Sequence, residues 1–141
     1  MTISIREASL NDIEAVICIW KICDLTRPWN DPTADFNLAL QSPASAVLLA
    51  EDGGILVGTV MMGFDGHRGW IYYLGIVPDR RKQGIAIRLM DAAANWLEER
   101  NCPKIELMVR RGNPATGFYE KAGWQKQDVD VYARWLTTKD T

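Results

Sequence analysis

The sequence predicts an α/β (α+β) fold with a mixed, mostly antiparallel sheet and flanking helices. Two glycine-containing turns, at residues 52–54 and 65–69, separate three successive apolar runs, which is typical of antiparallel hairpins. An amphipathic helical pattern then joins the third run to a fourth. Such a crossover makes the two strands that it connects parallel, and the connection itself is right-handed.

Length and composition favour one domain covering residues 1–141 with a substantial core. Apolar residues make up 48% of the 141-residue chain, which argues against disorder. A net charge of −2 without a long basic face argues against nucleic acid as the main partner. The N-terminus lacks a signal-peptide pattern, and no apolar run approaches membrane-spanning length. We therefore expect a cytoplasmic protein without a membrane partner, with a homodimer as one option for its assembly.

The first strand and the first helix follow from local patterns. Residues 3–7 are typical of a strand, and Ser9-x-x-Asp12 resembles a capping box at a helix start. A helix reaching about Ile22 is indicated by apolar residues at helical spacing, namely Ile13, Val16, Ile17 and Trp20.

The next segment predicts a loop, a short helix and a three-stranded meander. Prolines and Asn30 mark residues 25–32 as a loop, and Thr33 is a candidate cap for a helix reaching about Gln41. Three strands separated by the two turns follow, at residues 46–51, 55–64 and 70–77.

The second half predicts two further helices and three strands. A helix from residue 85 to about Asn101 carries one apolar stripe, made of Ile85, Leu89, Ala92, Ala93, Trp96 and Leu97. Asn113 and Pro114 are typical of a helix start, and Gly123 of a helix end. Strands are expected at residues 104–110, 124–128 and 131–136.

The turn between the strand at 70–77 and the following helix has the features of an anion site. The first N–H groups of a helix have no intrahelical partner and carry partial positive charge, so a phosphate can bind there. Gly84 and Ala86 are small where an anion would approach, and Arg80, Arg81 and Lys82 add charge. The chain has neither a Gly-x-x-x-x-Gly-Lys-Ser/Thr nor a Gly-x-Gly-x-x-Gly motif. A solvated strand-to-helix turn is the alternative interpretation.

Two motifs together resemble the GNAT superfamily of acyl-CoA-dependent N-acetyltransferases. Arg81-x-x-Gly84-x-Ala86 matches the pyrophosphate loop of that family. Asn113 and the later run from Phe118 to Trp124 (Phe-Tyr-Glu-Lys-x-Gly-Trp) match its second motif. The resemblance spans essentially the whole chain. Residues 23–32, 65–69 and 72–75 are further similar to the YpeA-type bacterial acetyltransferases.

The resemblance implies a sheet whose two parallel central strands splay apart and admit the pantetheine arm of acetyl-CoA. The arm would bind the backbone of Leu74 and Ile76 like an added strand, and Asn113 and Tyr119 would face the arm and the sulfur. The diphosphate would bind Arg81, Lys82, Gln83, Gly84, Ile85 and Ala86. Acetyl-CoA is then a co-substrate, and no metal is expected.

The reaction that the resemblance implies is direct attack by a primary amine of a small molecule, or of a protein or peptide, on the thioester. Tyr119 is the candidate donor of a proton to the thiolate, with packing as the alternative role. The acid that many family members carry on the strand before the loop is missing from residues 70–77. Candidate substitutes for this base are Tyr72, Tyr73, Asp65, His67 and Asp24, although Asp65 and His67 also suit a purely structural turn.

The loop at residues 25–32 and its neighbours supply candidates for acceptor binding. Arg27 suits a carboxylate, Asp24 or Asp31 an ammonium group, and Trp29 a pocket wall; Tyr72 is a further candidate. A proline-stiffened loop over the core is the alternative. Cys18, Cys23 and Cys102 have no zinc spacing and are expected to be small buried side chains. A non-catalytic acyl-CoA sensor of the same fold is the alternative function.

Overall fold

The computed structural model describes residues 2–137, which belong to two compact units, Met1–Met108 and Val109–Thr141. The first unit contains β1 (Ile3–Glu7), α1 (Ile13–Ile22), α2 (Pro32–Gln41), β2 (Ser45–Asp52), β3 (Ile55–Phe64), β4 (Gly69–Ile76), α3 (Ile85–Glu98) and β5 (Ile105–Leu107). Short 3-10 turns η1 (Leu10–Asp12) and η2 (Pro78–Arg80) precede α1 and α3. The second unit contains α4 (Thr116–Lys121).

The five strands form one mixed sheet in the order β1-β2-β3-β4-β5. The first three strand pairs are antiparallel, and β4 and β5 are parallel. This confirms the predicted mixed, mostly antiparallel sheet and the parallel crossover through α3. The parallel pair is short, because β5 contacts only Gly69–Ile71 at the start of β4. Among the described residues β5 is an edge strand, whereas a central strand was expected.

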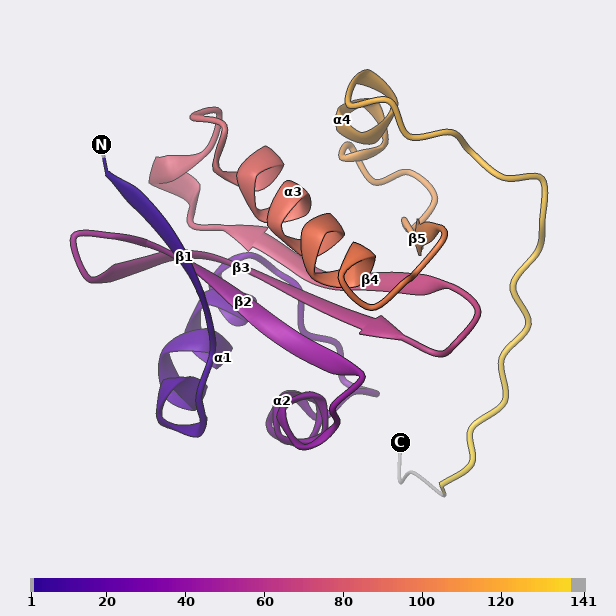
Figure 1. The fold of residues 1–141 in the computed structure, drawn as a ribbon, viewed down its shortest axis with the longest axis horizontal. Coiled ribbons are helices and arrows are strands. Elements are labelled where there is room, and N and C mark those ends of the chain that lie inside the picture. The colour runs from indigo at the N-terminus through magenta and orange to yellow at the C-terminus, as the bar shows by residue number, and fades with distance from the viewer. Residues whose placement is uncertain (1, 138–141) are drawn as a thin grey trace. The chain divides into compact units, whose positions relative to one another are not determined.

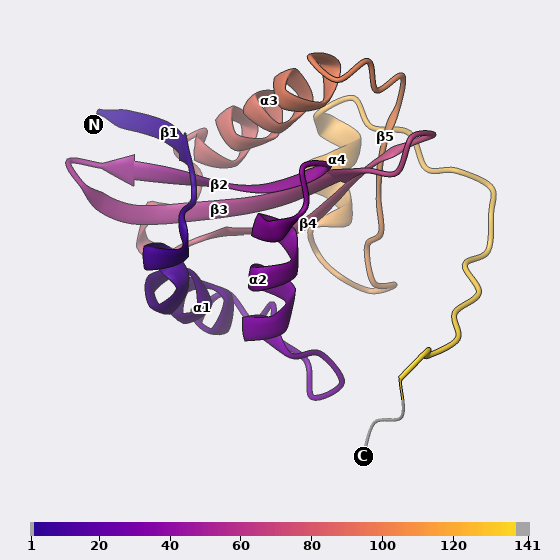
Figure 2. The same cartoon turned by 60° about the horizontal axis from the view of Figure 1, so that its bottom comes forward.

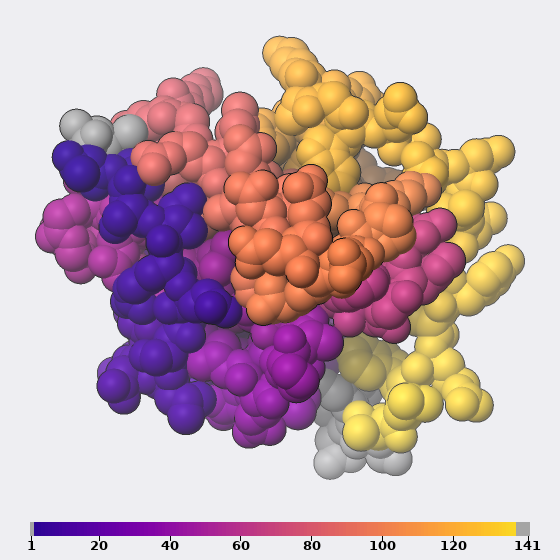
Figure 3. All heavy atoms as spheres, in the orientation of Figure 1, coloured from indigo at the N-terminus to yellow at the C-terminus, as the bar shows by residue number. Residues whose placement is uncertain are grey.

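The helices of the first unit cover both faces of the sheet (Figures 1 and 2). α3 lies on one face, where its side chains cover the middle of the sheet in the space-filling view (Figure 3). α1 and α2 lie on the other face. There a buried cluster joins them to the sheet, made of Val16, Trp20, Phe36, Ala39, Val47, Leu49 and Met61. This packing holds β3 and β4 between two layers of helix.

Sequence patterns explain where α1 and α3 form. The apolar stripe of α3 is turned to the sheet, so Leu89 and Ala93 are fully buried. At the start of α1, the Asp12 carboxylate accepts a hydrogen bond from the Ser9 N–H at 2.8 Å. It also accepts from both terminal nitrogens of Arg6, at 2.9 and 2.8 Å, and Arg6 reaches Glu51 on β2 at 2.6 Å. The entry to α1 is thereby tied to the sheet.

Several predicted boundaries were wrong. α2 begins at Pro32, and its cap is Asp31 instead of the expected Thr33. The Asp31 carboxylate accepts a hydrogen bond from the Ala34 N–H. Because a proline suits the first helical position, the residue before it becomes the cap. α3 ends at Glu98 rather than near Asn101, and Asn101 follows it in a left-handed conformation (φ 65°). β5 is shorter than residues 104–110, and α4 is shorter than residues 113–123.

The two predicted closing strands at 124–128 and 131–136 are absent from the described residues 122–137. In an extended chain Val131 and Trp135 point to one side and Tyr132 and Leu136 to the other. The apolar residues therefore do not define one face of a strand that could pack against a core. Tyr132 and Leu136 are 93% and 86% exposed.

The cysteines were also predicted incorrectly. Cys18 is exposed, and Cys23 and Cys102 are only partly buried. In α1 the core-facing positions are Val16, Ile19 and Trp20, so the helical period turns Cys18 outward.

Within residues 2–137, no helix is both long and apolar enough to cross a membrane.

Asp12→Asn should lower the free energy of unfolding by about 1 kcal/mol at pH 7, because one polar cap and a partly exposed ion pair are weakened. The Arg6 hydrogen bonds hold the pKa of Asp12 well below its usual range in the folded protein. The stabilisation is therefore present above the unfolded pKa of about 3.9 and is lost as pH falls through the lower folded pKa.

Chemical denaturation at several pH values measures this effect. The stability gap between the wild type and Asp12→Asn should narrow as pH falls below about 4. Glu14→Gln, on the exposed side of the same helix, is the control and should show a gap near zero throughout. An undiminished Asp12→Asn gap at about pH 2 would contradict the assignment.

Candidate functional site

The backbone edge at the end of β4, where β5 no longer pairs with it, is the central feature of the candidate site. β5 pairs with Gly69–Ile71, whereas β4 continues to Ile76. On the other side, β4 remains paired with β3 as far as Ile76, and the Val77 N–H donates to Val57 at 3.0 Å. Backbone groups alternate in direction along a strand, so those of Ile76 point away from β3. An extended ligand could therefore bind beside β4 where β5 has ended.

The Ile76 carbonyl already accepts two hydrogen bonds on this side. Arg81 Nε donates to it at 2.9 Å, and the Cys23 thiol donates to it at 3.3 Å. A ligand amide that is to bind this carbonyl must displace one of these donors. Arg81 is the exposed donor and can move without disturbing the core.

The turn that leads into α3 has the geometry expected of an anion site. Gly84 immediately precedes the helix in a left-handed conformation (φ 81°), and no side chain caps it. A Cβ at Gly84 would meet no atom within 4 Å, so the space beside it is open. The first turn of α3 carries no acidic residue that would compete with an anion. Ile85 is 1% exposed and anchors the helix start in the core.

Not all of the basic side chains around this turn are available to bind a ligand. Arg80 forms an ion pair with Asp52 at the β2–β3 hairpin, and this pairing lowers the pKa of Asp52. Lys82 (φ 64°), Gln83 and Arg81 are exposed at the rim. Arg80 therefore holds the turn against the sheet, whereas the sequence suggested a charge at the rim.

The candidate bases differ in their surroundings. Asp65 and His67 lie in the turn before β4, and Leu74 lies seven residues beyond His67, roughly 20 Å along a strand. The Asp65 carboxylate accepts from the backbone N–H groups of His67 and Arg68 at 2.8 Å each, which lowers its pKa. The Asp65 carboxylate therefore has a structural role in the turn, whereas a role of the His67 side chain stays a prediction.

Tyr73 is also a poor base in this setting. Its hydroxyl donates to Asp35 Oδ2 at 2.6 Å. Burial and this hydrogen bond raise the pKa of Tyr73 far above 10, which keeps the phenol protonated. Tyr72 is 42% exposed, and burial followed by the charge of Asp65 raises its pKa. The side chains of Asp24 and Tyr72 are both exposed, and proton removal through water at either residue stays a prediction.

The loop between α1 and α2 uses several of its polar groups internally. Arg27 donates to the carbonyls of Asp24 and Thr26 at 2.8 and 2.7 Å. The Asp24 carboxylate is 93% exposed and lies 3.6 Å from Arg27, and Asp31 caps α2. Trp29 is 39% exposed. Acceptor binding by Asp24, Arg27, Trp29 and Tyr72 stays a prediction.

The second unit contains Asn113 and Tyr119. Asn113 Oδ1 accepts from the Ala115 N–H at 2.8 Å and closes a turn before α4. Tyr119 packs edge-on against Phe118 and Trp124, with ring centroids 5.2 and 6.1 Å away. Burial raises the pKa of Tyr119. The roles predicted for both residues stay predictions.

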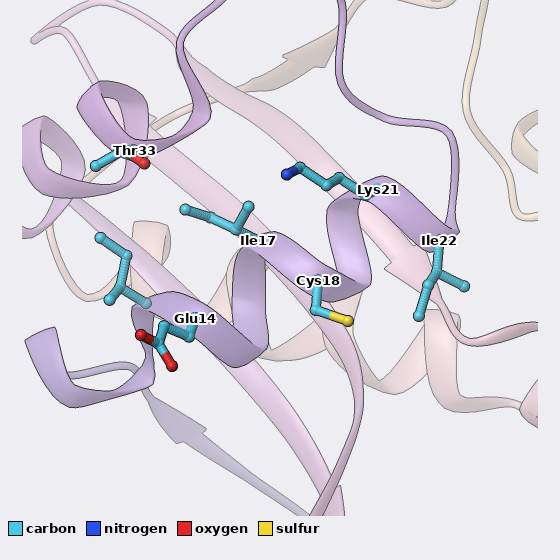
Figure 4. A pocket seen from close by; sticks show the side chains of 7 residues that line it. Glu14, Ile17, Cys18, Lys21, Ile22 and Thr33 are labelled. Carbon is cyan, nitrogen blue, oxygen red and sulfur yellow. The ribbon is translucent and has the colours of Figure 1, made fainter.

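A groove runs along α1 (Figure 4). Figure 4 shows the side chains of α1 with Thr33 of α2 across from them. The groove is lined by Ile13, Glu14, Ile17, Cys18, Lys21, Ile22 and Thr33. None of the predicted site residues lines it.

Sequence patterns did not indicate three residues that form contacts near the candidate site. Asp52 pairs with Arg80, Cys23 contacts the Ile76 carbonyl, and Thr59 binds the carbonyl of Tyr73 at 2.9 Å. They lie 28, 53 and 14 positions from these partners along the chain. No local pattern indicates such distant pairs; only the hairpin at residues 52–54 placed Asp52 at a sheet end.

Comparison with known proteins identifies the family. Residues 15–124 match the model of the acetyltransferase (GNAT) family. An acetyltransferase of Yersinia enterocolitica is 46% identical over 133 residues, which cover 94% of each chain. An acetyltransferase of Pectobacterium atrosepticum is 49% identical over 125 residues, which cover 88% of this chain and 89% of that protein.

Solved structures show the same fold. A predicted acetyltransferase of Clostridium acetobutylicum with acetyl-CoA has a TM-score of 0.78 at 25% identity, covering 94% of this chain and 96% of that chain. An aminoglycoside N-acetyltransferase in complex with CoA has a TM-score of 0.82 at 17% identity, covering 96% of each chain. The chain therefore belongs to the GNAT family of acetyltransferases.

Proposed function

We propose that the protein transfers the acetyl group of acetyl-CoA to a primary amine, with the cofactor bound along β4 and at the start of α3. The diphosphate binds N–H groups between Arg81 and Ala86. The pantetheine arm lies beside Leu74 and Ile76 as an added strand. The solved acetyltransferase complexes with acetyl-CoA and CoA support this choice of ligand.

The observation that carries the proposal is that two backbone features able to bind a ligand lie at one end of β4. β5 ends opposite Ile71, so within residues 2–137 β4 has no strand partner on this side from Tyr72 onward. η2 then leads directly from this edge to the uncapped start of α3. One ligand with an extended amide-containing arm and a diphosphate would match both sites.

The family match also supports one acetyltransferase domain for the whole chain. It runs from residue 15 to residue 124 and so includes parts of both compact units. On this proposal Asn113 faces the arm and Tyr119 donates a proton to the departing thiolate. Since burial raises the pKa of Tyr119, its phenol is protonated at neutral pH and transfers the proton late.

The acceptor is best matched by an amine of low pKa, such as an amino terminus or a small amino compound. Neutralising an amine of pKa about 10.4 costs roughly 4–5 kcal/mol at pH 7, whereas an α-amine of pKa about 8 costs about 1 kcal/mol. β4 carries no acidic residue to meet the larger cost. We assign proton removal to water held by Asp24 or Tyr72.

The absence of an acid from β4 also keeps a second function open, a non-catalytic acyl-CoA sensor. Release of free thiol from acetyl-CoA with a panel of amines and peptides separates the two. The enzyme should release thiol in proportion to acetylated product. CoA binding without thiol release for any amine would favour the sensor.

Gly84→Ala should weaken CoA binding by about tenfold, which corresponds to about 1.4 kcal/mol. The added methyl enters open space beside the expected diphosphate, and the left-handed φ of 81° disfavours any side chain. Gly66→Ala is the matched control, because Gly66 also has a positive φ (92°) and open space but lies in the turn before β4.

Calorimetry and denaturation measure the two effects. Both variants should lose about 1 kcal/mol of folding stability, since both are strained. Only Gly84→Ala should lose affinity for CoA. Equal CoA affinities in the two variants would place the diphosphate elsewhere.

Tyr119→Phe should lower kcat by roughly 10²-fold and leave the KM for acetyl-CoA nearly unchanged, because it removes a proton donor and keeps the ring. Tyr132→Phe is the control, since Tyr132 is 93% exposed. Steady-state kinetics with an acceptor from the thiol-release screen provide the measurement. A wild-type kcat in Tyr119→Phe would remove Tyr119 from the mechanism.

A further inference from the structure

Tyr73 has an unusual backbone conformation for a residue inside a strand. Its φ of 53° is in the left-handed region, where a bulky side chain is rarely found. The β3–β4 ladder shifts register at the same place, with Met61 opposite Tyr72 and Thr59 opposite Gly75. β4 therefore bulges at Tyr73 and Leu74. Such a conformation persists only where surrounding contacts hold it.

A buried hydroxyl provides the first of these contacts. Thr59 Oγ1 donates to the carbonyl oxygen of Tyr73 at 2.9 Å. Thr59 Oγ1 in turn accepts a hydrogen bond from the indole N–H of Trp20 at 3.1 Å. Thr59 and Trp20 are both fully buried. The hydroxyl thus satisfies the carbonyl at the bulge and the indole N–H together.

The side chain of Tyr73 provides the second set of contacts. Its ring stacks on Trp20 with centroids 3.8 Å apart and planes 10° apart. Its hydroxyl donates to Asp35 of α2 at 2.6 Å. Trp20, Thr59, Tyr73 and Asp35, which we call the bulge network, come from α1, β3, β4 and α2. Tyr73 is held at its backbone, its ring and its hydroxyl.

We propose that Thr59 is a positioning residue, which holds Tyr73 left-handed so that Leu74 presents its backbone to the pantetheine arm. The inference rests on the proposed function, because Leu74 directly follows Tyr73 and belongs to the expected arm site. Trp20 and Asp35 assist by fixing the Tyr73 ring. Without the Thr59 hydroxyl, a buried carbonyl and a buried N–H lose their partner, and the bulge relaxes.

Thr59→Val tests this because it keeps the shape and removes the hydroxyl. Calorimetry with CoA and with 3′-phosphoadenosine 5′-diphosphate, which lacks the arm, separates the two parts of the site. Thr59→Val should weaken CoA binding by about tenfold and leave affinity for the nucleotide fragment within about twofold of wild type. Thr59→Ser, which restores a hydroxyl, should bind CoA like the wild type.

Val47→Ala is the control for general destabilisation, because Val47 is buried in the core cluster without belonging to the bulge network. Val47→Ala should bind both CoA and the nucleotide fragment with wild-type affinity. Wild-type CoA affinity in Thr59→Val, or equal losses for CoA and the fragment, would overturn the inference and leave the proposed function intact. Failure of the wild type to bind either ligand would instead contradict the proposed function.

Tyr73→Phe provides a second route if Thr59→Val does not fold. It keeps the stacked ring and removes only the hydrogen bond to Asp35. CoA affinity should fall about threefold, with fragment affinity unchanged. Unchanged CoA affinity would contradict the role assigned to Asp35 in fixing the Tyr73 ring.

Discussion

The structure depends on one mismatch in strand length. β4 continues to Ile76, whereas its parallel neighbour β5 pairs with it only as far as Ile71. A sheet normally satisfies the backbone groups of an inner strand on both sides, so this mismatch creates an open edge next to the core. The crossover through η2 and α3 begins at the same end of β4. The open strand edge and the uncapped helix start thus follow each other in the chain.

Neither feature would bind acetyl-CoA strongly alone. A helix terminus contributes about 0.3–1 kcal/mol to binding an anion at an exposed site. Hydrogen bonds along a strand edge are worth about 0.5–1.5 kcal/mol each. Binding therefore needs a rigid arrangement in which the arm and the diphosphate are held together. The buried Ile85 and the Arg80–Asp52 ion pair fix the turn, and the bulge network fixes the strand.

Sequence reasoning was most successful where short-range chemistry determines structure. The apolar stripe of α3 and the turns at 52–54 and 65–69 predicted the helix and the hairpins that the structure contains. The apolar pattern that follows Gly84 predicted a helix start at this turn, whereas the left-handed conformation of Gly84 was not predicted. Local patterns failed for residues 124–136, because the apolar residues at 131–136 would point to both sides of an extended chain.

The bulge network could not be predicted, because its bonds join residues 39, 14 and 38 positions apart. A tyrosine does not predict a positive φ, and a threonine in an apolar strand does not predict a buried hydrogen-bond network. The sequence also predicts the basic turn only in part. Arg80 and Arg81 have structural partners in Asp52 and the Ile76 carbonyl, which only the folded arrangement shows.

The central claim is that the open edge of β4 and the start of α3 bind one ligand together. Amide chemical shifts of isotope-labelled protein, followed by NMR during titration with CoA, test it most directly. The account predicts that the amides of Leu74, Ile76, Gly84 and Ala86 shift together with a single affinity, while those of the 65–69 turn stay unchanged. Shifts confined to other parts of the chain, or none at saturating CoA, would contradict it.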